Sequence, residues 1–195
     1  LFFFLKDTYL QQKLILVLVS DKLTDRVEKS INKIKNLLSR YFLGLLFQIT
    51  ILLIIYSIDL AIFNVENAFI IAFLCALLNL IPYLGPIIGA ILMTLLTMSS
   101  FIGADFSEII LPKTIYVMIG FLIGQLVDNF FSQPFIFSNS VKSHPLEIFI
   151  VILASGIMLG PVGMIVGIPI YTSLKVIAQE FLPDNKIVKS LTKNF

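Results

Sequence analysis

Small and polar residues share one face of an otherwise apolar stretch, "TIYVMIGFLIGQLVDNFF", at residues 114–131. This face holds two glycines, two amides and a carboxylate: Gly120, Gly124, Gln125, Asp128 and Asn129. Glycines four residues apart let a second helix approach closely. A carboxylate inside a membrane span is costly, and it therefore indicates a site for a proton, a cation or a hydroxylated solute. The alternative is that Asp128 lies at the membrane surface, where it caps the helix or is solvated.

Two Gly/Pro breaks interrupt long apolar runs. The first is "NLIPYLGPIIGA" at 79–90 and the second is "LGPVG" at 159–163. A proline removes an amide donor and frees the carbonyl four residues earlier, which is tolerated in a bilayer only where the backbone is buried in protein or lines a cavity. Paired breaks of this kind indicate a transporter's binding region. The candidate residues of this solute or ion pathway are Asn79, Pro82, Gly85, Pro86, Gly89, Gly160, Pro161, Gly163 and Pro169, together with Gln125, Asp128 and Asn129. The alternative is that each break is only a tight turn.

The composition predicts an all-α polytopic membrane protein. The chain is 58% hydrophobic and 13% charged, and it has no Lys, Arg or His between Tyr41 and Pro112. A water-soluble fold could not cover its surface with such a stretch. Spans are expected at 41–63 and 114–131, and a loop is expected at 99–113. The broken runs 68–98 and 148–182 contain arms of about fifteen residues, which favours re-entrant hairpins because a span needs about 20 residues.

The predicted organisation has four parts. Residues 1–5 are expected to end a transmembrane helix whose beginning is missing, and 6–40 to form a polar segment with an amphipathic surface helix. Residues 41–182 are expected to form the transmembrane transport domain, and 183–195 a polar basic tail. Asp59, near one end of its span, is expected to reach the interface. The Lys-rich 6–40 segment and tail are expected to be cytoplasmic.

Several function classes have no support in the sequence. With one His and one Cys, and no HExxH or GxSxG motif, the chain offers no catalytic or metal-binding cluster, so we predict no enzyme, metal or cofactor. The net charge of +2 indicates no nucleic-acid partner. His144 precedes Pro145, where it either starts the next helix or titrates as a pH sensor. Asn79 is expected to bridge the backbone that Pro82 frees.

At these residues the chain resembles the autoinducer-2 exporter family of bacterial membrane proteins. The matching motifs are "NLIPYLGPIIGAI" (79–91), "QLVDNFFSQP" (125–134), "HPLE" (144–147) and "GPVGMIVGIPIYTSLKV" (160–176). The resemblance implies a multi-pass protein of the bacterial inner membrane that exports a small polar solute, with autoinducer-2 as the candidate. Some family members are linked instead to sodium/proton antiport, for which Asp128 would be the exchanging acid.

The sequence also departs from the family pattern. Leu92 stands where many relatives have a proline, and residues 135–143 lack the common glycine-lysine. These departures weaken the inference of the same substrate. A non-transporting membrane scaffold is the alternative from another class. The expected partners are the lipid bilayer and either a small polar solute or Na⁺ and H⁺, and a homo-oligomer stays open.

Overall fold

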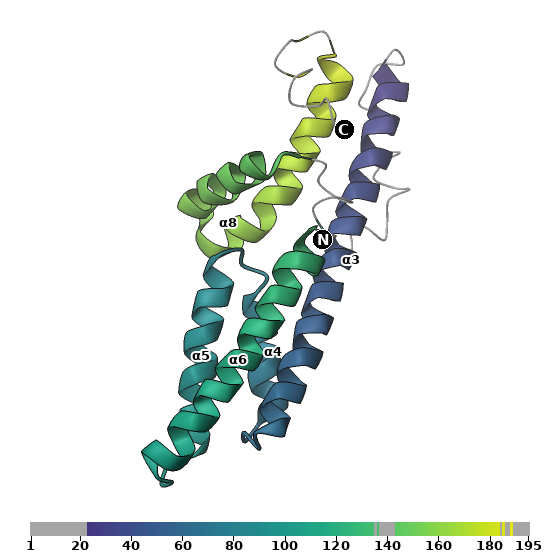
Figure 1. The fold of residues 1–195 in the computed structure, drawn as a ribbon. Helices are drawn as coiled ribbons and strands as arrows, with labels where there is room; N and C mark the ends of the chain where they lie inside the picture. The colour runs from purple at the N-terminus through teal and green to yellow at the C-terminus, as the bar shows by residue number, and fades with distance from the viewer. Residues whose placement is uncertain (1–22, 135, 137–142, 184, 186–187, 189–195) are drawn as a thin grey trace.

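A computed structural model describes residues 23–134, 136, 143–183, 185 and 188, and those residues contain helices and no β-strand. Four helices pack alongside one another and a folded-back fifth lies at one end of them (Figure 1). The predicted all-α architecture is confirmed. The expectations for residues 1–22 and for most of the tail lie outside the described residues.

The first described helix, α3, runs from Thr24 to Ile62 without interruption. Its 39 residues give a length of about 58 Å, roughly twice the hydrocarbon thickness of a bilayer. The amphipathic stretch up to Arg40 and the predicted span are thus one helix, and the boundary expected at residue 40 is not a structural break. Neither stretch contains a proline that could end the helix where they meet.

The first broken run folds as a helical hairpin. Its arms are α4 (Ala68–Leu78) and α5 (Leu84–Ser100), joined by a turn at 79–83 in which Tyr83 has a φ of +66°. The two outer ends of the hairpin meet, because the Glu66 amide donates a 2.6 Å hydrogen bond to Ser100 Oγ. At about 16 and 25 Å, both arms are shorter than a typical span, as the re-entrant interpretation requires.

The next helical run begins earlier than the sequence suggested. It comprises the π-helix η2 (Phe106–Ile110), α6 (Leu111–Val127) and the π-helix η3 (Asp128–Ser132). The Asp105 side chain caps its start by accepting a 2.8 Å bond from the Glu108 amide. The expected loop at 99–113 is therefore reduced to a few residues.

The last helix, α8 (Pro145–Phe181), is a second hairpin. Gly160 has φ +65° and ψ −152°, and it reverses the chain so that the two arms pack against each other. A side chain at Gly163 or Gly167 would collide with Ser155 on the opposite arm. By length and composition, three helical runs among the described residues could cross a membrane: Thr24–Ile62, Phe106–Ser132 and Leu146–Phe181. The third folds back at Gly160.

The glycines on α6 let α3 approach, as their spacing predicted. A Cβ at Gly124 would collide with the Tyr56 ring, and one at Gly120 with the Asp59 carboxylate. Asp59 is therefore buried against α6, at 9% exposure, and its expected position near the membrane interface stays a prediction. Its place opposite a glycine explains the burial, because the helices approach most closely where Gly120 leaves room.

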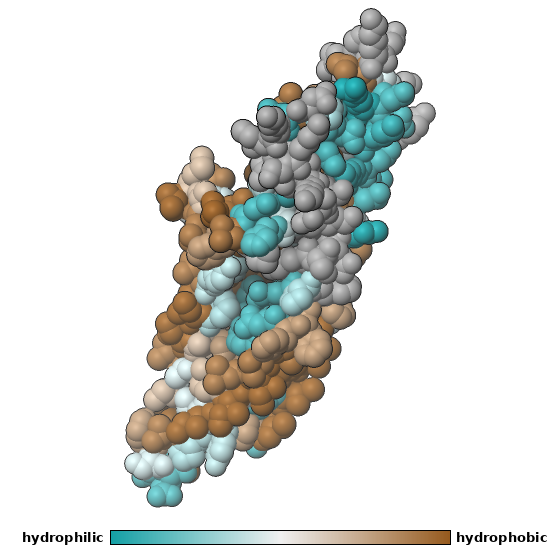
Figure 2. Space-filling model, turned by 45° about the horizontal axis from the view of Figure 1, so that its top comes forward, coloured by the Kyte–Doolittle hydropathy of each residue, from teal (hydrophilic) through white to brown (hydrophobic). Residues whose placement is uncertain are grey.

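The surface matches a membrane environment. Hydrophobic residues cover most of the visible face along the packed helices, while hydrophilic residues gather toward the two ends and in a smaller patch midway (Figure 2). Among the exposed apolar side chains are Ile58, Phe69 and Leu95, each more than half accessible. Such a large apolar surface is suited to lipid rather than to water.

Candidate functional site

Asp128 is buried in the middle of the molecule. Its residue is 1% exposed, and Oδ2 accepts 3.0 Å hydrogen bonds from Gln48 Nε2 on α3 and from Gln133 Nε2. Within the described part of the chain, Oδ1 has no hydrogen-bond partner. The alternative of a solvated Asp128 at the membrane surface is wrong, because α3 covers it. The carboxylate is instead held between two amides.

Gln125 connects three helices at the same level. Its Nε2 donates to Tyr56 Oη at 2.8 Å and to Asn79 Oδ1 at 2.9 Å, which ties the hairpin turn to α3 and α6. Asn79 Nδ2 donates to the Cys75 carbonyl at 3.0 Å. Asn79 therefore supports the backbone, but not at the carbonyl that Pro82 frees. That carbonyl, on Leu78, accepts from the backbone of the turn.

The segment that carries Asp128 departs from α-helical geometry. It forms η3, and such π-helical turns are frequent at functional sites. Gln133 follows η3 and donates to Asn129 Oδ1 as well as to Asp128, each at 3.0 Å. Gln125, Asn129 and Gln133 follow one another at intervals of four residues and thus form a line of uncharged amides, here called the amide row.

A cavity of about 1130 Å³ lies between the first hairpin, the amide row and the first arm of α8. Its lining includes the turn residues Pro82 and Tyr83, and Pro86 in α5. The opposite side includes Ser143 and Ile148. The first break therefore lines a cavity, which a simple tight turn would not need to do. Asp128 is not among the described residues that line it.

A second cavity of about 30 Å³ lies deeper, with room for roughly one water molecule. It is lined in part by Gln48 and Gln133, the two side chains that bind Asp128, and by Asn79 and Pro82. The turn of the first hairpin thus contacts both cavities.

The other residues of the first break have structural positions. A Cβ at Gly85 would collide with the Leu78 carbonyl, so the tight turn requires a glycine there. Gly89 faces Phe121 with ordinary contact distances and would leave room for a methyl group. Pro86 does not break a helix, contrary to expectation, because it lies in the first turn of α5, where its missing amide has no partner to lose.

The second break is not brought to Asp128. Gly160 and Pro161 form the tip of the α8 hairpin, where Met158 is 80% exposed, and neither lines the 1130 Å³ cavity. Pro169 does not interrupt the second arm, contrary to expectation. The carbonyl that it frees, on Ile165, accepts a 3.2 Å hydrogen bond from the Tyr41 hydroxyl of α3.

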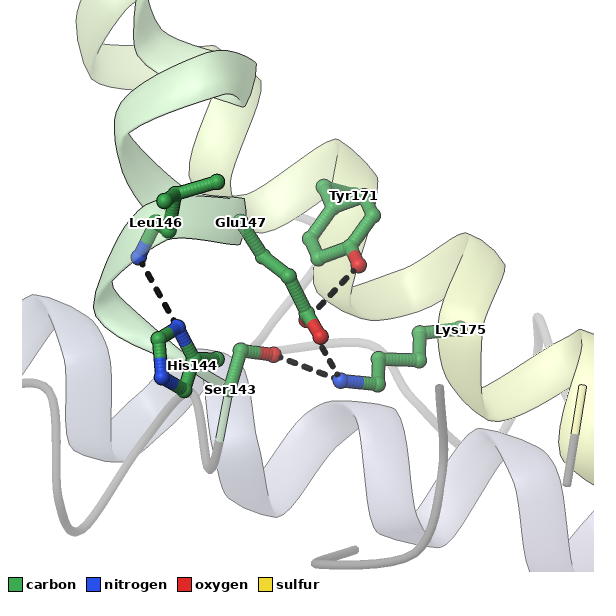
Figure 3. A network of polar contacts seen from close by, with 6 residues as sticks. All are labelled: Ser143, His144, Leu146, Glu147, Tyr171 and Lys175. Atoms are coloured by element: carbon green, nitrogen blue, oxygen red, sulfur yellow. Dashed lines mark hydrogen bonds and ion pairs between the residues drawn. The ribbon is translucent and has the colours of Figure 1, made fainter. Parts of the chain in front are cut away.

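A polar network joins the ends of the two α8 arms (Figure 3). Lys175 Nζ lies 3.0 Å from Glu147 Oε2 and donates to Ser143 Oγ at 2.8 Å, and the Tyr171 hydroxyl donates to Glu147 at 3.0 Å. His144 begins the helix, since its Nδ1 accepts from the Leu146 amide at 3.3 Å. The helix-start interpretation of His144 is confirmed.

Sequence reasoning missed four of these residues: Gln48, Tyr56, Gln133 and Lys175. Gln48 was visible as a polar interruption of a span, but its partner lies 80 residues away. In the described residues no group of three or more His, Cys, Asp or Glu could hold a metal.

The comparisons with known proteins agree with a membrane transporter. The model of the AI-2E family transporters matches residues 1–182. The chain belongs to the AI-2E transporter family. This is a family of transporters and not of enzymes. No solved structure matches the chain.

Three similar proteins come from Bacillus subtilis (strain 168). "Putative transport protein YrrI" is 30% identical over 181 residues, which cover 93% of this chain and 49% of that protein. YueF is 26% identical, over 90% of this chain and 45% of its own, and YtvI is 27% identical, over 93% and 45%. Both are also named "Putative transport protein". The chain spans about half the length of these relatives.

Proposed function

We propose that this chain carries the solute pathway of a membrane transporter, in which a small polar solute binds between the turn of the first hairpin and the amide row. Family membership supports transport in general. The observation that carries the proposal is the 1130 Å³ cavity, which Pro82 and Tyr83 of the broken segment line together with Gln125 and Asn129. Autoinducer-2 is the candidate solute that the resemblance suggests.

The pathway is proposed to lie in the inner membrane of a bacterium, with the start of α3 in the cytoplasm. Residues 24–40 hold five basic and two acidic side chains, and basic loops stay on the cytoplasmic side. In that orientation the first hairpin enters from the outer side.

Sodium/proton antiport through Asp128 is the second candidate. It is favoured by a buried carboxylate that, among the described residues, has no partner at Oδ1 and only amide donors at Oδ2. The adjoining 30 Å³ cavity has room for one small ion or water. In this mechanism the carboxylate charge is essential, whereas in solute export it serves to hold Gln133 and Gln48.

Two substitutions of Asp128 separate these mechanisms. In Asp128→Asn the remaining carbonyl oxygen can accept both amide hydrogen bonds, so the charge is lost while these two contacts can persist. In Asp128→Ala the Gln48 amide loses its acceptor, whereas Gln133 keeps Asn129 Oδ1, so we expect a cost of about 1–3 kcal/mol for the one unsatisfied group. Solute export predicts that the Asn variant keeps most of its transport and the Ala variant loses about tenfold or more. Antiport predicts that both variants are inactive.

The test uses the full-length protein in liposomes, with a trapped pH dye in one set and labelled autoinducer-2 in another. Proton flux that requires both sodium and Asp128 would establish antiport and overturn the export proposal. Efflux of the labelled signal without sodium-dependent proton flux would support export. No flux of either kind in correctly inserted protein would leave the non-transporting scaffold.

A further inference from the structure

The larger cavity has chemically different walls, and its described lining residues carry no charge. We propose that it binds an uncharged amphipathic solute, with polar groups on the amide row and an apolar part against α5. The inference rests on the proposed function and narrows its solute class. It excludes strongly charged solutes, and it favours solutes with an apolar part over solutes that are polar on every side.

None of the described side chains that line the cavity is charged. Asp128 lies behind the amide row, at 1% exposure, and its Oδ2 is bound by Gln133. Glu147 and Lys175, near Ser143, are bound to each other. An ion that entered the cavity would lose water without gaining a counter-charge, which is unfavourable by several kcal/mol.

The polar wall offers neutral hydrogen-bonding groups. Gln125 lines the cavity at 8% exposure, but its Oε1 is buried and its Nε2 is bound to Tyr56 and Asn79, so it shapes this wall rather than binding the solute. Asn129 is exposed and Gln133 is half-buried, so both are accessible to a solute. Amides both donate and accept, which suits hydroxyl and carbonyl groups. The opposite wall, on α5, is entirely apolar and includes Ile87, Ala90 and Ile91.

The size of the cavity also favours a solute with an apolar part. Ligand pockets commonly measure about 300–1000 Å³, and this cavity reaches about 1130 Å³. Two of its lining residues on α5, Ile87 and Ile91, are 59% and 57% exposed, so the cavity is open along this helix. An apolar chain can therefore occupy the space beside α5 while the polar group reaches the amide row.

The test measures protection of an engineered cysteine in the full-length protein in nanodiscs, with Cys75 replaced by alanine. Ile91→Cys lies in the cavity, and Leu95→Cys, one turn further along α5 and 60% exposed, is outside it. Alkylation by N-ethylmaleimide is followed at each site by peptide mass spectrometry. The probes are hexyl β-glucoside, methyl β-glucoside and hexyl phosphate.

We expect hexyl β-glucoside to slow alkylation of Ile91→Cys at least fivefold and to leave Leu95→Cys unchanged. Methyl β-glucoside, which lacks the apolar chain, and hexyl phosphate, which is charged, should have little effect. Adding Asn129→Leu should raise the half-protecting concentration about five- to tenfold, as expected for one lost hydrogen bond. Three results would each overturn the inference. They are equal protection by hexyl phosphate or by methyl β-glucoside, protection of both cysteines, and no protection by any probe.

The protection assay and the flux assay fail independently. Selective protection without flux would contradict the transport proposal and leave the binding inference standing. Flux without selective protection would support transport and show that the solute class is wrong.

Discussion

The ion pair between Glu147 and Lys175 should hold the two arms of α8 together. Lys175 is 5% exposed, so Lys175→Met removes a buried charge and leaves Glu147 with hydroxyl donors alone, from Tyr171 and Ser143. Breaking a fully buried pair costs about 3–5 kcal/mol. The Glu147 side chain is 25% exposed and can regain some water, so we expect a smaller loss of about 1–3 kcal/mol.

The assay is thermal unfolding of the full-length protein in detergent, with the change in apparent Tm as the readout. In the double variant, Glu147→Gln with Lys175→Met, the unpaired charge is gone and the introduced amide can still accept from Tyr171. Its apparent Tm should return most of the way to the wild-type value. Lys113→Met is the matched control, because Lys113 lies 4.0 Å from the centre of the Phe101 ring and should cost about 1 kcal/mol or less. A double variant as destabilised as the sum of its single variants would refute a direct ion-pair contribution.

Three further predictions concern packing and backbone support. Gly124→Ala should lower the apparent Tm by several degrees, because its methyl group collides with a tyrosine ring of α3, whereas Gly89→Ala has room and should leave it nearly unchanged. Tyr41→Phe removes the hydroxyl that binds the carbonyl freed by Pro169 and should cost about 1–3 kcal/mol. Adding Pro169→Ala restores a backbone donor and should recover that loss, and an unrecovered double variant would contradict the assignment. His144→Ala should lower the stability by about 0.5–2 kcal/mol because the N-cap is lost, whereas His144→Asp keeps the cap. If His144→Asp shifts the pH profile of flux at unchanged stability, His144 would instead be a pH sensor.

The helices and their breaks could be predicted because they depend on local patterns. Long apolar runs identified the spans, and the glycine spacing on α6 identified the face that α3 approaches. The effect of each proline was less predictable, because it depends on what replaces the missing bond. Pro86 lies where an amide has no helical partner to lose, and Pro169 is supported by a hydroxyl more than a hundred residues away.

The site itself could be predicted only in part. Asp128 and Gln125 were identified from residue type and spacing, but their partners on α3 depend on which faces the helices turn toward each other. The ion pair of Glu147 and Lys175 could not be found from spacing, because the two residues become neighbours only after Gly160 reverses the chain. The tip of the second hairpin was expected near Asp128 because the two motifs look alike, and the fold separates them.

The depth of the first hairpin determines across which layer of the protein most of a membrane potential would drop. Its turn lies level with Gln48, since both line the small cavity, and Gln48 is about 10 Å along α3 from Tyr41 and about 21 Å from Ile62. The buried apolar core of α3, α4, α5 and α6 occupies the longer side. We therefore expect most of the voltage to drop between the hairpin turn and Ile62. An ion that crosses this layer would gain or lose up to about 2.3 kcal/mol per 100 mV, so its flux would depend on voltage, whereas the flux of an uncharged solute would not.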